Sequence, residues 1–581
     1  MKDSKKEFHI KGGEKILNII KSFSATEKFI FSIFTIIAIV SSFSLALSVN
    51  NLFLVPVPAH GGKISEGIVG LPRYINPVLA ITDIDNDLST LIYAGLMKYE
   101  NGKIISDLAE KYTVSADGLV YTFTLKDNLR FHDGIAITTD DIEFTIQKIE
   151  DIIIKSPLRA DWANIGIKKI NDKEIQFILK QPYTPFLSNT TVGILPKHIW
   201  SKVSPEQFIY SQYNLEPIGA GPYRIGRIQR DNGGIPEFYT LYPFNRYNNG
   251  EAYIEELEIR FYPNEKLAIE EYNANIIQTL ARISPQEANT IGTSTAHTEI
   301  LHSPLPRIFG IFLNQNQAPI FTNEIVRKAL NESAPKNRIV NEVLYGYGIE
   351  SDSPLPIKNI EKATEDSSGN IEKAKKMLID DGFATTSDGV LEKKDKKGIQ
   401  RLEFSIATVD SPDLKHIAEI VKEEWAKIGV KVNIKVFEYG DLYQNIISTR
   451  RYDALLFGES IGKDIDLYAF WHSSQRNAPG LNIAMYVNSK VDKILEDIRV
   501  SSDEKVKEEK YSQFEKIIKD EVPAIFLYSP EFIYIVSDKV RGLELGNVIN
   551  PSSRFYNINK WYTETDNVWK FFIKDSNNKK E

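Results

Sequence analysis

A strand and a helix follow each other in the first strongly patterned region of the chain, residues 118–149. Every second residue from Tyr121 to Leu125 is aromatic or aliphatic, with threonines between, as in a strand that buries one face. Asp-Gly dipeptides at both ends predict turns. Thr138 and Asp141 then form a capping-box-like start for a helix whose isoleucines share one face. The pattern predicts a compact α+β subdomain.

A different arrangement follows in residues 402–439. The run LEFSIATV predicts a strand, and a helix follows with Ser411 as N-cap, Pro412 at its first position and Gly429 as its C-terminal stop. The next segment, VKVNIKVFEY, alternates valine and isoleucine with polar residues, which predicts a second strand. A strand, a helix and a strand with short links predict a βαβ unit with a parallel pair.

The next predicted strand is YDALLFG, residues 452–458. The residues that follow it leave the carboxyl end of a strand in an α/β lobe. Open α/β sheets place their ligands at this edge. We therefore expect the loop after Gly458 to face a ligand.

The N-terminal region contains a charge-free stretch, residues 29–49, of about the twenty residues that a membrane-spanning helix needs. Lysines occur only on its N-terminal side within the first 50 residues, at positions 2, 5, 6, 11, 15, 21 and 28. The positive-inside rule puts that side in the cytoplasm and the bulk of the chain outside. We expect an uncleaved anchor; the alternative is a signal peptide cut near Ala46 to Ser48. The lysine flank argues against a buried soluble helix.

Length and composition narrow the function classes. With 581 residues the chain is too long for one hydrophobic core. A net charge of −8 without a basic patch argues against nucleic-acid binding. The chain has no cysteine and only eight scattered histidines, which excludes thiol chemistry and lipid attachment through cysteine and argues against a zinc site. No cofactor or metal is expected.

The stretch GESIG, residues 458–462, has the G-x-S-x-G pattern of a hydrolase nucleophile elbow. An elbow needs a helix directly behind the serine, whereas GKDIDL is polar and turn-like. The triad order also needs a histidine after a later strand, but the last histidine, His472, is close enough to share the loop of Ser460. We therefore expect no enzymatic activity and keep a surface serine hydrolase only as an alternative.

Several stretches, read in order, resemble the family 5 extracellular solute-binding proteins, the oligopeptide, dipeptide and nickel binders of ABC importers. They are YINPVLAITDIDNDLSTLIYAGLMKYE, the block from Leu108 to Ile149, TVGILPKHIW, PIGAGPYRI, FLNQNQAPIFTNEIVRKAL, and NSKVDKILEDIR followed by DEVPAIFLY. The resemblance covers residues 74 to about 530. It implies an α/β fold of two lobes with an additional α+β subdomain, behind one N-terminal transmembrane helix.

The resemblance also implies domain boundaries and a hinge. The chain would cross between the lobes near RIFGIFLNQN and again near VPAIFLYSP, which allows closure around a ligand. The expected parts are a cytoplasmic basic segment (1–28), the anchor (29–49), a linker (50–62), lobe I (63–79, 196–307 and 530–565), its inserted subdomain (80–195), lobe II (308–529) and a polar tail (566–581).

The implied function is capture of a peptide and delivery to an ABC permease with its ATPases. Peptide-binding members pair the ligand's ammonium group with an aspartate in the loop after the strand that matches YDALLFG. That position falls here at Gly462 or Lys463, and a lysine there favours an anion such as a carboxylate. The expected ligand-facing residues are Glu459, Lys463, Asp464, Asp466, Trp471, His472, Asn314 and Asn316. The alternatives are plain loop charges for the acids, turn residues for the asparagines, and a non-peptide solute as ligand.

Overall fold

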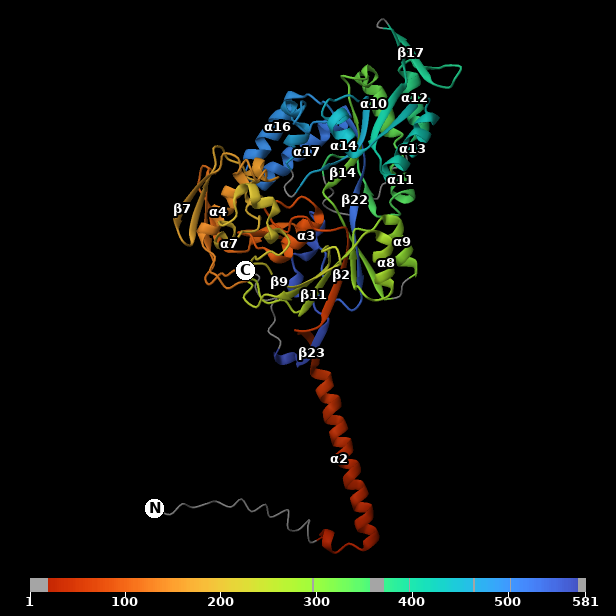
Figure 1. Ribbon diagram of the computed structural model, residues 1–581. Coiled ribbons are helices and arrows are strands. Elements are labelled where there is room, and N and C mark those ends of the chain that lie inside the picture. The colour runs from red at the N-terminus through yellow and green to blue at the C-terminus, as the bar shows by residue number, and fades with distance from the viewer. Residues whose placement is uncertain are drawn as a thin grey trace. The chain divides into compact units, whose positions relative to one another are not determined.

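The computed structural model describes residues 19–294, 297–355, 370–395, 398–462, 466–501 and 503–572. The chain divides into two compact units, Met1–Ala59 with Glu564–Glu581, and His60–Thr563. Figure 1 shows the elements of both units.

The smaller unit consists of a long helix and a two-stranded sheet. Helix α2, Ala25–Phe53, starts at a capping box between Ser24 and Glu27, has no buried residue, and is long and apolar enough to cross a membrane. Strand β1, Leu54–Ala59, pairs antiparallel with β23, Glu564–Trp569, and a short 3-10 turn, Lys570–Phe572, follows β23.

These elements differ from the predicted linker (50–62) and polar tail (566–581). The helix continues to Phe53 and β1 begins directly behind it. The prolines of VPVPA suggested a linker, but an isolated pair of strands has two open edges where proline is tolerated. Residues 566–569 of the predicted tail complete β23, whose Val568 lies opposite Val55.

The larger unit is organised by one mixed twelve-stranded sheet. Its main path is β20 (Lys431–Phe437), β19 (Glu403–Val409), β21 (Ala454–Ser460), β14 (Arg307–Leu313), β22 (Ala524–Ser537), β12 (Thr279–Ala281), β2 (Lys63–Val69), β11 (Glu256–Tyr262), β10 (Pro236–Pro243) and β9 (Tyr223–Arg230). Strands β13 (Thr298–Pro304) and β15 (Gly348–Glu350) also pair with β22.

Strand β22 runs through both lobes of this unit. Its first half pairs with β14 and its second half pairs with β12 and β13. Separate hydrophobic cores pack against the two halves of this strand. One core includes residues of β2 and β9–β11 together with residues 75–208 and 532–561. Two others include residues of β14, β19, β21 and the first half of β22. The lobe boundaries drawn from the sequence stay predictions, and these separate cores support them.

Lobe II contains the predicted βαβ unit. Strands β19 and β20 are parallel, and helix α13, Pro412–Lys427, connects them, with Ser411 as N-cap and Gly429 in the left-handed region at φ +83°. Strand β21 is the predicted strand YDALLFG and lies parallel to β19. Helices α16 (Ser489–Val500) and α17 (Glu504–Glu521) pack against the core behind β21.

The predicted α+β subdomain is also confirmed. Strands β5 (Ala109–Val114), β6 (Val120–Leu125), β8 (Glu174–Ile178) and β7 (Gly166–Asn171) form an antiparallel sheet, and α4 (Thr139–Glu150) starts at a capping box between Thr138 and Asp141. A small hairpin, β3 (Met97–Glu100) with β4 (Lys103–Ser106), precedes it.

A buried ion-pair network ties β2 to helix α3, Asp83–Ile92. Arg554 is fully buried and donates to Glu66 Oε1 at 2.6 and 2.8 Å and to both oxygens of Asp87 at 2.9 Å. Arg282 donates to Asp87 at 2.8 Å, and Tyr534 donates to Glu66 at 2.5 Å. Although burial acts to lower it, the two carboxylates raise the pKa of Arg554 further above its already high value. The network therefore keeps its charges in the lobe I core.

Candidate functional site

A cavity of about 420 Å³ in the larger unit is lined by residues of both lobes. Its volume falls within the range of about 300–1,000 Å³ that is usual for small-molecule sites. Lobe II contributes Ile461, Gly462 and Asp466, from the loop after β21. The rest of the lining comes from residues 77–107, which include α3 and β3, from residues 158–193 and 550–559, and from Pro222 and Tyr247. The loop after Gly458 thus faces a concave site, as the strand pattern predicts.

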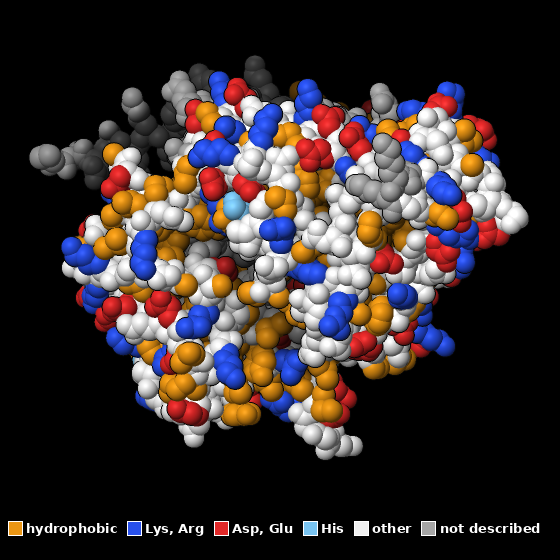
Figure 2. Space-filling view, turned by 90° about the horizontal axis from the view of Figure 1, so that it is seen from above, with side chains coloured by type: hydrophobic (Ala, Val, Ile, Leu, Met, Phe, Trp, Pro, Cys, Tyr) orange, Lys and Arg blue, Asp and Glu red, His pale blue; other side chains and the backbone are white. Residues whose placement is uncertain are grey.

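The described charged side chains do not gather by sign on the face of the larger unit that Figure 2 draws. On the face of the larger unit drawn in Figure 2, basic and acidic side chains of the described residues are intermixed. The cavity is therefore the candidate site.

Close backbone contacts fix the cavity wall at Tyr93. Gly221 donates its N–H to the carbonyl of Ile92 at 2.8 Å, and a Cβ added to Gly219 would lie 2.0 Å from that oxygen. Only glycine fits so near a backbone oxygen. Asp85, at the start of α3, accepts the N–H groups of Arg73 and Tyr74 at 2.7 and 2.9 Å. These contacts hold the wall rigidly.

Two hydroxyl groups of the cavity lining have no internal hydrogen-bond partner among the described residues. Ser89 Oγ and Tyr93 Oη are both buried, at 9% and 5% exposure of their residues. Burial raises the pKa of Tyr93 well above its ordinary value, so its hydroxyl stays protonated and available as a donor. An unpaired buried hydroxyl costs about 1–3 kcal/mol. A ligand that bonds both groups removes this cost.

Asp107 lines the same cavity next to the β3 hairpin. Its Oδ1 accepts from the side-chain amides of Asn248 at 2.9 Å and Asn249 at 2.6 Å. Burial nevertheless raises the pKa of Asp107, against the lowering effect of the Asn248 bond and of Lys98. The carboxyl group therefore binds its proton more readily than a surface aspartate does.

Replacing Asp107 with asparagine is expected to change how stability depends on pH. A folded-state pKa above the ordinary 3.8 gives stability that is complete below that value and is lost as pH rises through the folded pKa. Asparagine keeps the acceptor oxygen but carries no charge. The free energy of unfolding of Asp107→Asn minus that of the wild type should therefore grow as pH rises from about 4 to 7.

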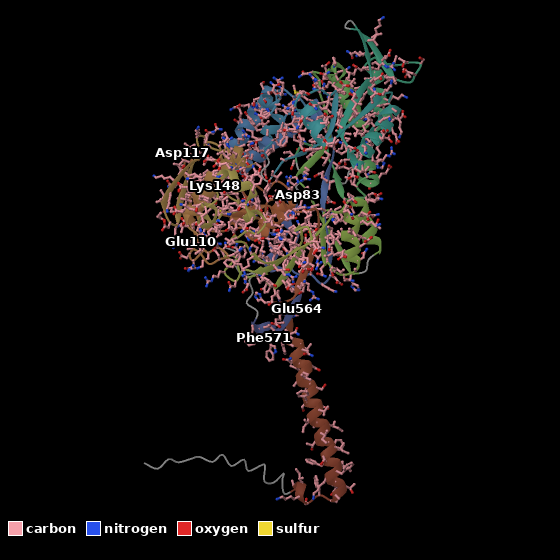
Figure 3. All side chains as sticks on the ribbon, viewed as in Figure 1. Asp83, Glu110, Asp117, Lys148, Glu564 and Phe571 are labelled. Carbon is pink, nitrogen blue, oxygen red and sulfur yellow. The ribbon has the colours of Figure 1, made fainter. Side chains whose placement is uncertain are left out.

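Urea unfolding at a series of pH values measures this difference. Asp117→Asn is the matched control on the inserted subdomain (Figure 3), because the Ser115 hydroxyl lowers the pKa of Asp117 and its contribution is lost as pH falls. A pH profile of Asp107→Asn parallel to that of the wild type would show that folding does not raise the pKa of Asp107.

Of the predicted site residues that the structure describes, Asp466 alone lies in the cavity lining. Its charge is already paired, because Arg499 at the end of α16 donates to Oδ1 at 3.0 Å and to Oδ2 at 2.6 and 3.0 Å. The guanidinium group lies 3.9 Å from the ring centroid of Tyr468. A ligand ammonium group at Asp466 would therefore compete with Arg499.

The other described residues of that prediction lie away from the cavity. Trp471 is fully buried in the lobe II core, where its large ring packs against Phe526. His472 stacks on Tyr468 with ring centroids 4.0 Å apart and is nearly buried. Glu459 points into the interior from β21, where burial raises its pKa well above the ordinary value. The positions of these three side chains depend on tertiary packing, which a local sequence pattern does not reveal.

Asn314 and Asn316 lie in the turn that follows β14. This matches the alternative interpretation of the sequence, in which both asparagines are turn residues. Asn314 is buried, donates to the carbonyl of Arg450 at 3.0 Å and accepts the N–H of Asn316 at 3.2 Å. Asn316 is exposed. The two remaining predicted residues, Lys463 and Asp464, lie outside the described residues.

The G-x-S-x-G segment lacks the geometry of a nucleophile elbow. Gly458, Glu459 and Ser460 are ordinary strand residues of β21, paired in register with Phe309, Ile308 and Arg307. An elbow instead places its serine at a sharp turn from strand to helix. Among the described residues, the next helix after Ser460 is α15, which begins at Tyr468. Because Ser460 lies within a strand and not at such a turn, its position argues against a catalytic role.

The sequence interpretation missed Ser89, Tyr93, Asp107 and Arg499. Ser89 and Tyr93 belong to a stretch that carries the family resemblance, YINPVLAITDIDNDLSTLIYAGLMKYE. Polar residues on the otherwise apolar face of α3 were the available signal, because Ser89 lies there among Leu88, Leu91 and Ile92. Nothing in the local sequence of Arg499 indicated its pairing with Asp466.

Comparison with known proteins gives a consistent picture. The model of the family "Bacterial extracellular solute-binding proteins, family 5 Middle" matches residues 103–480. The chain is 27% identical over 519 residues to the oligopeptide-binding protein AppA of Bacillus subtilis, covering 87% of this chain and 92% of that protein. It is 22% identical over 516 residues to a dipeptide-binding protein of Escherichia coli, covering 84% and 92%.

Solved structures agree with the fold. The structure of AppA from Bacillus subtilis in complex with a nonapeptide matches with a TM-score of 0.66 and 26% identity, over 87% of this chain and 99% of that chain. The substrate-binding protein CtaP of Listeria monocytogenes matches with a TM-score of 0.73 and 24% identity, over 87% and 100%. Both comparisons show the two-lobed α/β architecture that the sequence predicts.

Proposed function

The chain belongs to family 5 of the bacterial extracellular solute-binding proteins, and we propose that it captures peptides between its two lobes and delivers them to the permease of an ABC importer. The observation that carries this proposal is the cavity of about 420 Å³ that both lobes line. A solute that contacts both lobes stabilises the closed arrangement over an open one, because it gains those contacts only when the lobes meet.

The chemistry of the lining supports a peptide as the solute. The unpartnered hydroxyls of Ser89 and Tyr93 suit the carbonyl and carboxylate oxygens of a peptide main chain. Tyrosine and tryptophan rings beside them give apolar area for side chains. Relatives named as oligopeptide- and dipeptide-binding proteins support the same class of ligand.

Helix α2 supports a proposal for where the protein is placed in the cell. We propose that this helix stays uncleaved and crosses the membrane once, with the lysine-rich N-terminal segment in the cytoplasm and both lobes outside. Tethering keeps the receptor at a high effective concentration near its permease. An uncleaved helix also replaces the lipid anchor that a chain without cysteine cannot carry.

Native mass spectrometry of the gently purified full-length chain tests the ligand class. We expect a series of bound peptide masses that is lost on mild denaturation and dialysis and regained when the peptides are added back. A single non-peptide mass that rebinds would contradict the peptide proposal while leaving solute capture intact. Ser460→Ala is the matched control, because binding should not change if Ser460 is no nucleophile.

Closure itself is predicted to depend on Arg499. The carbonyl of Arg499 accepts from the N–H and hydroxyl of Thr184 at 3.3 and 3.4 Å, and its guanidinium lies 5.8 Å from the ring of Tyr183, whereas the same group pairs with Asp466 in lobe II. The stacking on Tyr183 is the contact that joins the side chain of Arg499 to the other lobe, so Arg499→Ala should weaken ligand binding about two- to fivefold, the effect of losing about 0.5–1 kcal/mol.

Isothermal titration with a peptide recovered from the native protein measures the change in Kd. Lys493→Ala is the matched control, because this exposed residue of α16 pairs only within its own helix, with Glu496 and Asp497. Small-angle scattering of the ligand-free Arg499→Ala variant should show a larger radius of gyration. Equal affinity of this variant and the wild type would refute a closing role of Arg499.

A further inference from the structure

Five apolar side chains at the C-terminal end of α2 form an exposed cluster that solute capture does not use. Phe571 and Phe572 are 73% and 76% exposed, and the cluster as a whole consists of Leu52, Phe53, Trp569, Phe571 and Phe572. We call it the juxtamembrane aromatic cluster. It joins the end of the helix to the C-terminal segment of the chain, within the smaller unit.

Specific contacts hold this cluster at one level of the helix. The indole Nε1 of Trp569 donates to Asn50 Oδ1 at 2.8 Å. The ring of Phe53 lies 6.4 Å from that of Trp569 and 5.4 Å from that of Phe571. The β1–β23 register places Leu54 opposite Trp569. The depth of Trp569 along the helix axis is therefore set by Asn50 and Phe53.

The depth of the cluster in a bilayer follows from comparing the length of α2 with the thickness of the bilayer's layers. Residues 29–49, the charge-free part of α2, rise about 31 Å at 1.5 Å per residue, which matches a hydrocarbon core of about 30 Å. Residues 50–53 continue for about 6 Å, which matches the interfacial layer of about 5–8 Å on each side of that core. Asn50 and Phe53, and with them Trp569, fall in this layer.

The residues of β23 change from aromatic to acidic with increasing distance from α2. Its aromatic end lies beside the helix, whereas Glu564 and Asp566 occupy the far end, opposite Ala59 and Val57 (Figure 3). Glu564 lies about 16 Å along the strand from Trp569 at the usual rise per residue. That distance exceeds the thickness of the interfacial layer and puts the carboxylates in water. Tryptophan and other aromatic residues favour the interface itself.

We propose that the juxtamembrane aromatic cluster inserts into the interfacial layer of the bilayer, so that the C-terminal segment makes a second contact with the membrane, in addition to α2. The partner is the boundary between phospholipid headgroups and acyl chains. This inference rests on the uncleaved anchor proposed above. It gives the exposed aromatic rings an apolar partner that water does not offer.

Trp569 provides the probe. The chain has six tryptophans, and the other five, Trp162, Trp200, Trp425, Trp471 and Trp561, are all fully buried in the larger unit. The full-length protein is reconstituted in vesicles of phosphatidylcholine brominated either near the headgroup or near the chain end. The fluorescence of the wild type minus that of Trp569→Phe isolates the signal of Trp569.

We expect lipid brominated near the headgroup to quench the Trp569 signal at least twofold more than lipid brominated near the chain end. Replacing both Phe571 and Phe572 with serine should reduce this quenching at least twofold, while Phe238→Ser, which alters a ring outside the cluster, should leave it unchanged. Phe238 lies on β10 of the larger unit.

Two results would overturn the inference, and they are distinguishable. If intact-mass analysis shows the full-length chain in the vesicles but bromine does not quench Trp569, the cluster does not touch lipid, and the anchor proposal stands. If the cell yields only a chain cut near Ala46 to Ser48, the anchor proposal fails and the inference fails with it.

Discussion

Replacing Arg554 with methionine is expected to lower the free energy of unfolding by about 3–5 kcal/mol, the usual cost of removing one partner from a buried ion pair. Arg554 is fully buried between Glu66 and Asp87, which are also fully buried. Methionine fills a similar volume but leaves these two carboxylates with fewer donors. Their desolvation is then no longer compensated, and this makes the loss large.

Urea unfolding of the full-length wild type and variant measures the loss. Arg541→Met is the matched control, because Arg541 is exposed and takes part in the structure through its main chain, paired with Tyr562; its effect should stay within about 0.5 kcal/mol. Arg554→Lys, which keeps the charge without the planar fork, should fall between the two.

A combined variant separates charge from packing. Adding Glu66→Gln and Asp87→Asn to Arg554→Met removes the uncompensated carboxylates and should recover about half of the lost stability. If this triple variant is as unstable as Arg554→Met alone, the loss comes from packing and the electrostatic explanation is wrong.

Gly219→Ala is expected to destabilise the protein by about 3 kcal/mol, because its Cβ meets backbone that cannot rotate away. The added atom would lie 2.0 Å from the carbonyl oxygen of Ile92. The carbonyl of Gly219 also accepts the N–H of His132 at 2.8 Å, so the glycine cannot retreat without breaking that bond. The strain falls on Ile92 and Tyr93, and thus on the cavity wall.

The variant should therefore lose affinity for peptide as well as stability. Urea unfolding and isothermal titration measure the two effects. Gly233→Ala is the control, because its Cβ would meet only the flexible carboxylate of Asp231, at 3.3 Å, in an exposed turn; it should change stability by less than about 0.5 kcal/mol. Unchanged unfolding of Gly219→Ala would contradict the close approach of the two backbones.

Local patterns were enough to predict many elements of this protein. The alternation around Phe123, the capping box of Thr138 and Asp141, and the stop at Gly429 each depend on residues within one turn or one strand. Such signals act through the backbone of the element itself, and tertiary packing did not override them here. The order of these elements along the chain also carried the family resemblance.

The candidate site was only partly predictable. The loop after Gly458 was expected to face a ligand, and Ile461, Gly462 and Asp466 do line the cavity. The pattern could not show that Arg499, on a helix that starts 23 residues after Asp466 at Ser489, neutralises that carboxylate. It also could not separate the buried Trp471 from a cavity wall, because both environments favour an aromatic ring.

The sequence by itself therefore determined many of the elements, the family, the apolar N-terminal span and the strand end that faces the cavity, because each of these depends on neighbouring residues or on their order. The tertiary structure alone decided which polar groups meet. It joins Glu66, Asp87 and Arg554 in the lobe I core, and it brings Trp569 to Asn50 at the end of α2. Contacts between residues more than 400 positions apart arise from how the chain folds back on itself, and no local period records them.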